Sequence, residues 1–199
     1  MKIGILALQG AFIEHEQILA GLNTETNMGT HIETIEIRQL SDLQKEIDGL
    51  IIPGGESTVI GKLLHDLELF HPLQEMIMQG LPVFGTCAGA ILLAEKIAND
   101  HCHYFASLPV EIQRNAYGRQ LGSFQAYENF GKNKIPMIFI RAPYIKSVLA
   151  DDVEVLSIVD NKIAAVRYHN QLITCFHPEL TKDTTVHQYF IDIIKKSKL

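Results

Sequence analysis

The chain has 199 residues, a formal net charge of -6 and a sequence pI near 5.8. Its composition, 47% hydrophobic and 20% charged, is typical of a globular protein and argues against a disordered or fibrous one. The acidic balance disfavours a nucleic-acid-binding surface, because phosphate contacts require clustered Lys and Arg side chains.

The length favours a single domain over residues 1–199. No apolar run reaches the roughly 18 to 20 residues that span a bilayer, and the first residues lack a signal-peptide pattern, so we expect a cytoplasmic protein. The three cysteines have no framework spacing, which argues against a disulfide scaffold and leaves at least one free thiol to explain.

The first half of the chain alternates apolar strand patterns with helical patterns. Strands are predicted at residues 2–8, 31–37, 49–53 and 81–86, helices at 12–22, 59–67, 73–78 and 90–97, and a polar loop at 23–30. Short apolar strands joined by helical crossovers indicate a parallel, doubly wound sheet, in which ligands bind at the carboxyl ends of strands.

The second half is predicted to consist mostly of strands. They are expected at residues 110–113, 122–127, 137–140, 153–159, 163–167 and 172–176, followed by an amphipathic helix over 181–196. We expect these strands to extend the sheet and to add antiparallel pieces. The predicted fold class is therefore α/β, a three-layer, doubly wound and mostly parallel sheet with helices on both faces.

Cys87 lies in the sequence Gly85-Thr86-Cys87-Ala88-Gly89, between a predicted strand and a predicted helix. This is the pattern of a nucleophile elbow, with cysteine where hydrolases place serine. Small flanking residues permit a sharp, strained turn that exposes the sulfur, and a helix N-terminus favours the thiolate. Taken alone, the pattern is equally compatible with a structural cysteine buried in a tight turn.

His177 and Glu179 follow the last predicted strand, in the sequence Phe176-His177-Pro178-Glu179. Extended geometry would direct both side chains to the same side, where His177 can deprotonate Cys87 while Glu179 orients His177. An isolated tripeptide of this kind would instead be interpreted as a polar surface turn. Its combination with an elbow favours the catalytic interpretation.

Pro53-Gly54-Gly55-Glu56-Ser57 is a third motif, a glycine-rich turn between a strand and a helix. Its backbone N–H groups could bind either a phosphate or the oxyanion of an acyl-transfer intermediate. The segment lacks the Gly-Lys-Ser/Thr ending of a P-loop.

With these motifs the chain resembles the class I glutamine amidotransferases, and within them the glutaminase subunits of pyridoxal 5'-phosphate synthases. The resemblance runs nearly from end to end. It is carried by Leu8-Gln9-Gly10-Ala11, Pro53 to Thr58, Phe84 to Gly89, Arg114-Asn115, Gly118-Arg119-Gln120, Phe139 to Pro143 and Phe176 to Thr181.

The resemblance implies a triad of Cys87, His177 and Glu179, with the backbone amides of Gly55 and Ala88 as the oxyanion hole. The residues that it implies for the glutamine pocket are Gly55, Glu56, Ser57, Arg114, Ile140 and Arg141. Free glutamine carries a carboxylate and an ammonium, and Arg114 or Arg141 with Glu56 could pair with them.

The implied reaction is hydrolysis of L-glutamine to L-glutamate and ammonia through a glutamyl thioester, without a cofactor or a metal. The implied partner is a barrel-shaped synthase subunit that combines the ammonia with ribose 5-phosphate and glyceraldehyde 3-phosphate. Two alternatives stay open: the glutaminase half of imidazole glycerol phosphate synthase, and a non-catalytic subunit that binds glutamine as a signal.

The sequence departs from this family at three places. Tyr144 stands where a histidine is usual, Ala116-Tyr117 replaces the usual Ser-Phe, and residues 23–30 look inserted. None of these changes removes a member of the implied triad.

Other reactive side chains receive no role. His101-Cys102-His103 lacks the second ligand pair of a structural zinc site, and Cys175 lies in an apolar strand. Four further histidines are expected to be partly exposed on helices or at helix ends and stay unassigned: His15, His65, His71 and His187.

Overall fold

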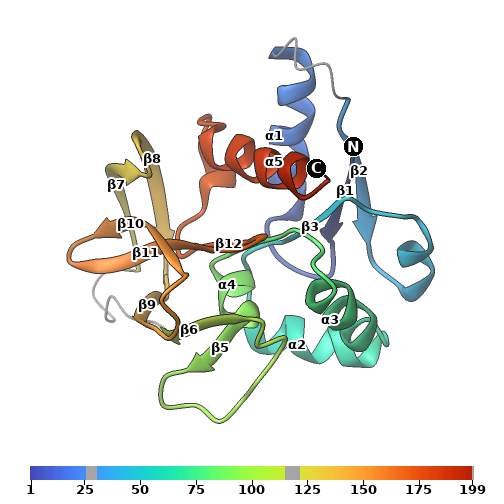
Figure 1. The fold of residues 1–199 in the computed structure, drawn as a ribbon, viewed down its shortest axis with the longest axis horizontal. Helices are drawn as coiled ribbons and strands as arrows, with labels where there is room; N and C mark the ends of the chain where they lie inside the picture. The colour runs from blue at the N-terminus through green and yellow to red at the C-terminus, as the bar shows by residue number, and fades with distance from the viewer. Residues whose placement is uncertain (26–30, 115–121, 199) are drawn as a thin grey trace.

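A ten-stranded sheet runs through the centre of the molecule, with helices on both sides (Figure 1). The computed structural model describes residues 1–25, 31–114 and 122–198. The strand order is β2-β1-β3-β4-β12-β11-β9-β6-β5, and β10 adds to the sheet by pairing with β11.

The first five strands of this order are all parallel to one another. They are β2 (Glu33–Ile37), β1 (Lys2–Leu6), β3 (Gly49–Ile52), β4 (Val83–Thr86) and β12 (Gln171–Thr174). Every residue of β3 and β4 is buried. Continuous apolar runs of this kind are typical of parallel strands that are covered on both faces.

Antiparallel pairs enter the sheet on the other side of β12. The strands are β11 (Lys162–Tyr168), β9 (Tyr144–Val148), β6 (Leu108–Gln113), β5 (Ala94–Ile97) and β10 (Glu154–Val159). A separate hairpin consists of β7 (Ser123–Phe130) and β8 (Asn133–Ile140).

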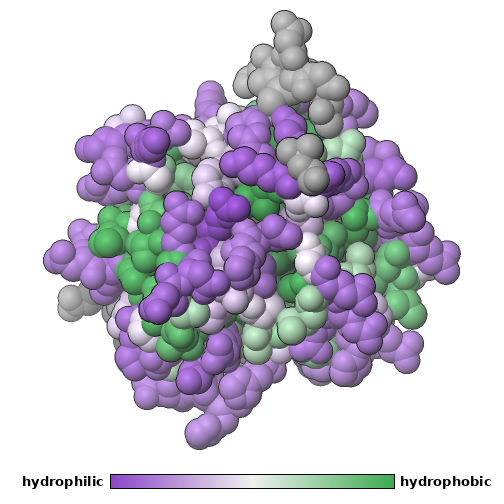
Figure 2. Space-filling view, viewed as in Figure 1, coloured by the Kyte–Doolittle hydropathy of each residue, from purple (hydrophilic) through white to green (hydrophobic). Residues whose placement is uncertain are grey.

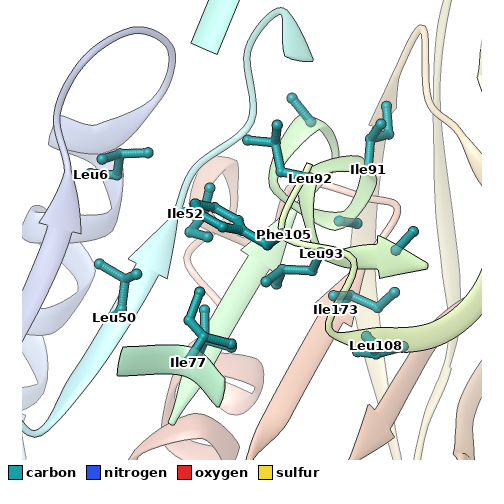
Figure 3. Packing of buried hydrophobic residues seen from close by; sticks show 14 of the residues in the cluster. Leu6, Leu50, Ile52, Ile77, Ile91, Leu92, Leu93, Phe105, Leu108 and Ile173 are labelled. Atoms are coloured by element: carbon teal, nitrogen blue, oxygen red, sulfur yellow. The ribbon is translucent and has the colours of Figure 1, made fainter. Parts of the chain in front are cut away.

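The helices divide between the two faces of the sheet, and each group covers its own apolar cluster. Residues of α2 (Ser57–Asp66), α3 (Phe70–Met78) and α4 (Ala88–Leu93) belong to one cluster, where side chains of β3, α4 and β12 meet Phe105 (Figure 3). Residues of α1 (Phe12–Glu25) and α5 (Thr185–Ser197) belong to the other cluster, which also includes buried residues of β7 and β8. Two short 3-10 helices, η1 (Leu40–Gln44) and η2 (Pro178–Leu180), lie in connections.

The predicted fold class is confirmed, including the antiparallel extension of the sheet. Four local predictions were wrong. The helix predicted at 90–97 ends at Leu93 and its last four residues form β5, because pairing with β6 outweighs their helix propensity. Strand β9 was missed, and α5 begins at Thr185 rather than Thr181. Helix α1 continues to Glu25, three residues into the predicted loop, whose residues 26–30 lie outside the described part.

Hydrophilic residues cover most of the face shown in Figure 2, and hydrophobic residues gather in smaller patches towards its sides. The large hydrophobic side chains that are exposed include Val155 and Ile158 of β10. Among the described residues, no helix has the length and apolar character needed to cross a membrane.

Candidate active site

The three chemically distinctive motifs follow three neighbouring parallel strands. In the sheet β4 lies between β3 and β12, with Ile52 of β3 opposite Gly85 and Thr174 of β12 opposite Thr86. Because parallel strands end at the same edge, the Gly54-Gly55 turn, Cys87 and His177 emerge together there. The expectation that the site lies at strand carboxyl ends is thereby met.

Cys87 occupies a strained turn between β4 and α4. Its backbone has φ 48° and ψ -98°, a left-handed conformation that costs energy for any residue with a side chain. The cysteine N–H donates to the Thr174 carbonyl at 2.8 Å, and its carbonyl accepts from the Ile91 N–H at 3.3 Å. A Cβ at Gly89 would overlap the Ile52 carbonyl oxygen, so glycine permits the close approach of α4 to the sheet.

His177 and Glu179 are in direct contact. His177 Nδ1 lies 2.6 Å from Glu179 Oε1, and the two side chains are almost completely buried. The segment is not extended as predicted: the chain turns into η2 at Pro178, and this turn brings the carboxylate back to the imidazole. The backbone N–H of His177 donates to the Ile138 carbonyl of β8 at 2.8 Å. This bond holds the His177 backbone against β8.

The charge state of His177 follows from its two partners. Burial alone would lower its pKa, but hydrogen bonds to Cys87 and Glu179, together with the negative charges of these groups, raise the pKa of His177 to about 10. His177 is therefore an imidazolium at neutral pH, held between a sulfur and a carboxylate.

The Gly54-Gly55 turn packs tightly against this group. A Cβ at Gly54 would overlap the His177 ring and lie 3.3 Å from the Cys87 Cβ. On the other side, Gly10 has φ 95°, and a side chain there would overlap the Gly54 carbonyl. The Ala11 N–H donates to that carbonyl at 3.2 Å. The turn is therefore clamped between the Gly10 segment and the His177–Cys87 pair.

The remaining predicted pocket residues surround this centre unevenly. Glu56 is exposed and its N–H donates to Gln9 Oε1 at 2.8 Å, while Ser57 is buried at the start of α2. Ile140 and Arg141 stand at and just after the end of β8, two to three residues from the carbonyl that binds His177. Ala88, the other predicted oxyanion donor, is buried as the first residue of α4.

Arg114 has partners that the sequence did not suggest. Its guanidinium donates to Asp100 at 2.9 Å and to the Tyr104 hydroxyl at 3.3 Å. The neighbouring motif residues Asn115, Gly118, Arg119 and Gln120, and the departures at Ala116 and Tyr117, lie outside the described residues.

Two further cysteines differ strongly in environment. Cys102 is exposed in a loop, whereas Cys175 is buried just after β12, and burial raises the pKa of its thiol. Within the described ranges, no group of three or more His, Cys, Asp or Glu side chains is placed to hold a metal ion.

Sequence reasoning missed a set of buried polar side chains behind Glu179. His15 and His187 were expected to be partly exposed, and this was wrong: both are completely buried. The helical spacing contains the signal, because His15 shares a face with Leu19 and Leu22, and His187 shares one with Phe190 and Ile194. A histidine on an apolar helix face faces the core.

Comparisons with known proteins agree on one family. The family model of the SNO glutamine amidotransferase family matches residues 5–196. The chain is 55% identical over 199 residues to the pyridoxal 5'-phosphate synthase subunit PdxT of Desulfitobacterium hafniense (strain DSM 10664 / DCB-2), covering 100% of this chain and 96% of the relative. It is 51% identical over 202 residues to the subunit of the same name from Streptococcus pneumoniae (strain CGSP14), with 100% of both covered.

A solved structure described as a glutamine amidotransferase superposes with a TM-score of 0.85 at 36% sequence identity, covering 97% of this chain and 98% of the other. The match of fold and sequence thus extends over the whole described architecture, including the strand ends that carry Cys87 and His177. The chain belongs to the SNO glutamine amidotransferase family.

Proposed function

We propose that this chain is the glutaminase subunit of a pyridoxal 5'-phosphate synthase, which hydrolyses L-glutamine and delivers the ammonia to a synthase subunit. The observation that carries the proposal is the 2.6 Å contact of His177 with Glu179, beside Cys87 at a strained elbow. The two relatives that are named as pyridoxal 5'-phosphate synthase subunits, which are more than half identical to this chain over its full length, support it.

In the first half of the reaction, the Cys87 thiolate attacks the side-chain carboxamide carbon of glutamine. The oxygen gains negative charge, which the backbone N–H groups of Gly55 and Ala88 stabilise. The imidazolium of His177 then gives its proton to the departing nitrogen, the C–N bond breaks, and ammonia leaves behind a glutamyl thioester on Cys87.

In the second half, water hydrolyses the thioester. The neutral His177 accepts a proton from water, the hydroxide attacks the thioester carbon, and the C–S bond breaks to release glutamate and restore the thiolate. Glu179 holds the Nδ1 side of the ring throughout, so that Nε2 faces the reacting atoms.

Recognition of glutamine is assigned to residues around this centre. The ammonium and carboxylate of the substrate pair with Glu56 and with Arg141 or Arg114, while Gly55, Ser57 and Ile140 line the pocket. For Arg114 this role requires the guanidinium to exchange Asp100 for the substrate carboxylate, or to bind both.

The synthase subunit that receives the ammonia is proposed to be barrel-shaped and to form a hetero-oligomeric complex with this chain in the cytoplasm. Direct transfer between subunits has a chemical rationale, because free ammonia is protonated at neutral pH and ammonium is not a nucleophile.

The test is formation of pyridoxal 5'-phosphate from glutamine, ribose 5-phosphate and glyceraldehyde 3-phosphate by this chain mixed with a synthase subunit. The wild-type chain should support product formation, and Cys87→Ala should abolish it while ammonium chloride restores it. The matched control is Cys102→Ala, which removes an exposed thiol in a loop and should leave turnover unchanged.

Undiminished glutamine hydrolysis by Cys87→Ala would remove the proposed mechanism. If the wild-type chain hydrolyses glutamine but no pyridoxal 5'-phosphate forms, the chain is a glutaminase that supplies another synthase. Failure of a thiol-reactive glutamine analogue to label Cys87 would favour a subunit that only binds glutamine.

A further inference from the structure

The buried polar chain does not end at Glu179. His15 of α1 places its Nε2 3.7 Å from Glu179 Oε2 and 3.4 Å from the Thr86 hydroxyl. Its other ring nitrogen, Nδ1, lies 2.9 Å from His187 Nε2 of α5. A continuous row of polar side chains therefore leads from Cys87 through His177 and Glu179 into the core.

Glu179 uses only one of its two carboxylate oxygens in the contact with His177. Its Oε2 is buried and has no hydrogen-bond partner among the described residues. A buried carboxylate oxygen without a donor is costly, because it has lost its water. Within the described part of the chain, the only ionic contact of this oxygen is with His15 Nε2, which requires a shift of less than 1 Å to reach hydrogen-bond distance.

The protonation of the two histidines follows from their surroundings. Burial, and after it the proximity of His187 and His177, lowers the pKa of His15, and burial lowers that of His187 to about 3. Both rings are therefore neutral at neutral pH, so each carries one N–H and one lone pair.

One tautomer pair satisfies more atoms than the other. In one arrangement, the His187 Nε2–H donates to His15 Nδ1. The N–H of His15 is then on Nε2, where it faces Glu179 and Thr86. His187 Nδ1, which has no partner among the described residues, then carries only a lone pair. The reverse arrangement buries an unpaired N–H at His187 and turns a lone pair of His15 towards the carboxylate. The first arrangement is favoured, because it leaves neither histidine N–H without an acceptor.

Packing holds both rings in place. Phe84, three residues before Cys87, meets the His15 ring at 88° with centroids 5.9 Å apart and the His187 ring at 84° with centroids 5.7 Å apart. The first turn of α1 directly follows the Gly10 segment that clamps the Gly54 turn. The start of α1 therefore lies next to the Gly54 turn and also carries His15, which lies beside Glu179.

Resting on the proposed glutaminase function, we propose that His15 is a positioning residue, whose Nε2–H holds the second oxygen of Glu179 and so fixes the carboxylate against His177. His187 acts one step further away by setting the tautomer of His15. Neither histidine touches glutamine, so their effect is on the orientation of His177 and not on substrate binding.

The test compares two substitutions of His15 in the complex with the synthase subunit. His15→Leu keeps the volume but removes the donor, and we expect kcat for glutamine hydrolysis to fall about 10- to 100-fold while KM stays within about twofold. His15→Gln carries an amide N–H near the position of Nε2, and it should recover kcat to within about fivefold of wild type. Leu19→Val, one turn along α1, is the control for lost packing and should keep the wild-type kcat.

A double-mutant cycle separates positioning from a purely structural role. If His15 acts through the Glu179 carboxylate, adding His15→Leu to Glu179→Gln should lower kcat by less than about twofold further. A full additional loss in that background, or a His15→Leu enzyme with wild-type kcat, would overturn the inference. Absence of hydrolysis by the wild-type complex would instead refute the proposed function.

Discussion

Gly54→Ala tests whether the glycine turn is required because His177 stands against it. An added Cβ would overlap His177 Cε1 and lie 3.0 Å from its Nδ1, whereas ordinary contacts begin at 3.4 Å. Gly54 does not have a positive φ, so alanine brings a steric clash without backbone strain. The ring must move by about 1 Å, and a displacement of this size at a reacting group costs about 100-fold in rate.

The assay is steady-state glutamine hydrolysis in the presence of the synthase subunit, with thermal unfolding measured in parallel. The matched control is Gly21→Ala, where an added Cβ on α1 meets no atom within 4 Å. It should raise stability by about 0.5 to 1 kcal/mol through helix propensity and leave turnover unchanged. Wild-type kcat in Gly54→Ala would refute the reasoning, because it would mean that His177 does not need its present position.

Three other outcomes follow from the same geometry. Gly89→Ala should lower the free energy of unfolding by about 1 to 3 kcal/mol in urea titrations, because its Cβ would overlap the backbone of Ile52. Between pH 7 and pH 5, His187 should account for a loss of roughly 2 kcal/mol of stability, since its folded pKa is about 3 and it takes up its proton only on unfolding. His15, whose pKa is also lowered by burial, acts in the same direction. His177, with its pKa raised to about 10, stays protonated in the folded state across this window and offsets about 1 kcal/mol of the loss, because its unfolded form takes up a proton near pH 6.5. His187→Leu should therefore reduce the pH dependence by roughly 2 kcal/mol in urea titrations at the two pH values. Arg114→Ala should raise KM for glutamine by about tenfold or more with kcat nearly unchanged, if its guanidinium binds the substrate carboxylate, and an unchanged KM would remove it from the pocket.

The sequence was sufficient to predict the sheet class and the motifs at its edge, because buried parallel strands and their following turns have strong local patterns. The elbow conformation of Cys87 follows from its two flanking glycines in this way. The end of α4 could not be predicted, since Ala94 to Ile97 has no helix breaker and becomes a strand only by pairing with β6. The contact of Arg114 with Asp100 was invisible for the same reason, because it depends on how a loop folds back.

The location of His15 shows why sequence motifs alone do not identify every residue of the site. Cys87, His177 and Gly55 lie in turns after strands, where unusual residues stand out from the apolar pattern around them. His15 and His187 lie inside regular helices, and their neighbours are ordinary core residues. The proximity of His15 to Glu179, and of His187 to His15, arises only when α1 packs beside η2 and α5 packs on the same face of the sheet. A polar residue on an apolar helix face is therefore the signal to follow, because burial obliges it to find partners. Those of His15 are His187, Thr86 and the carboxylate that orients His177.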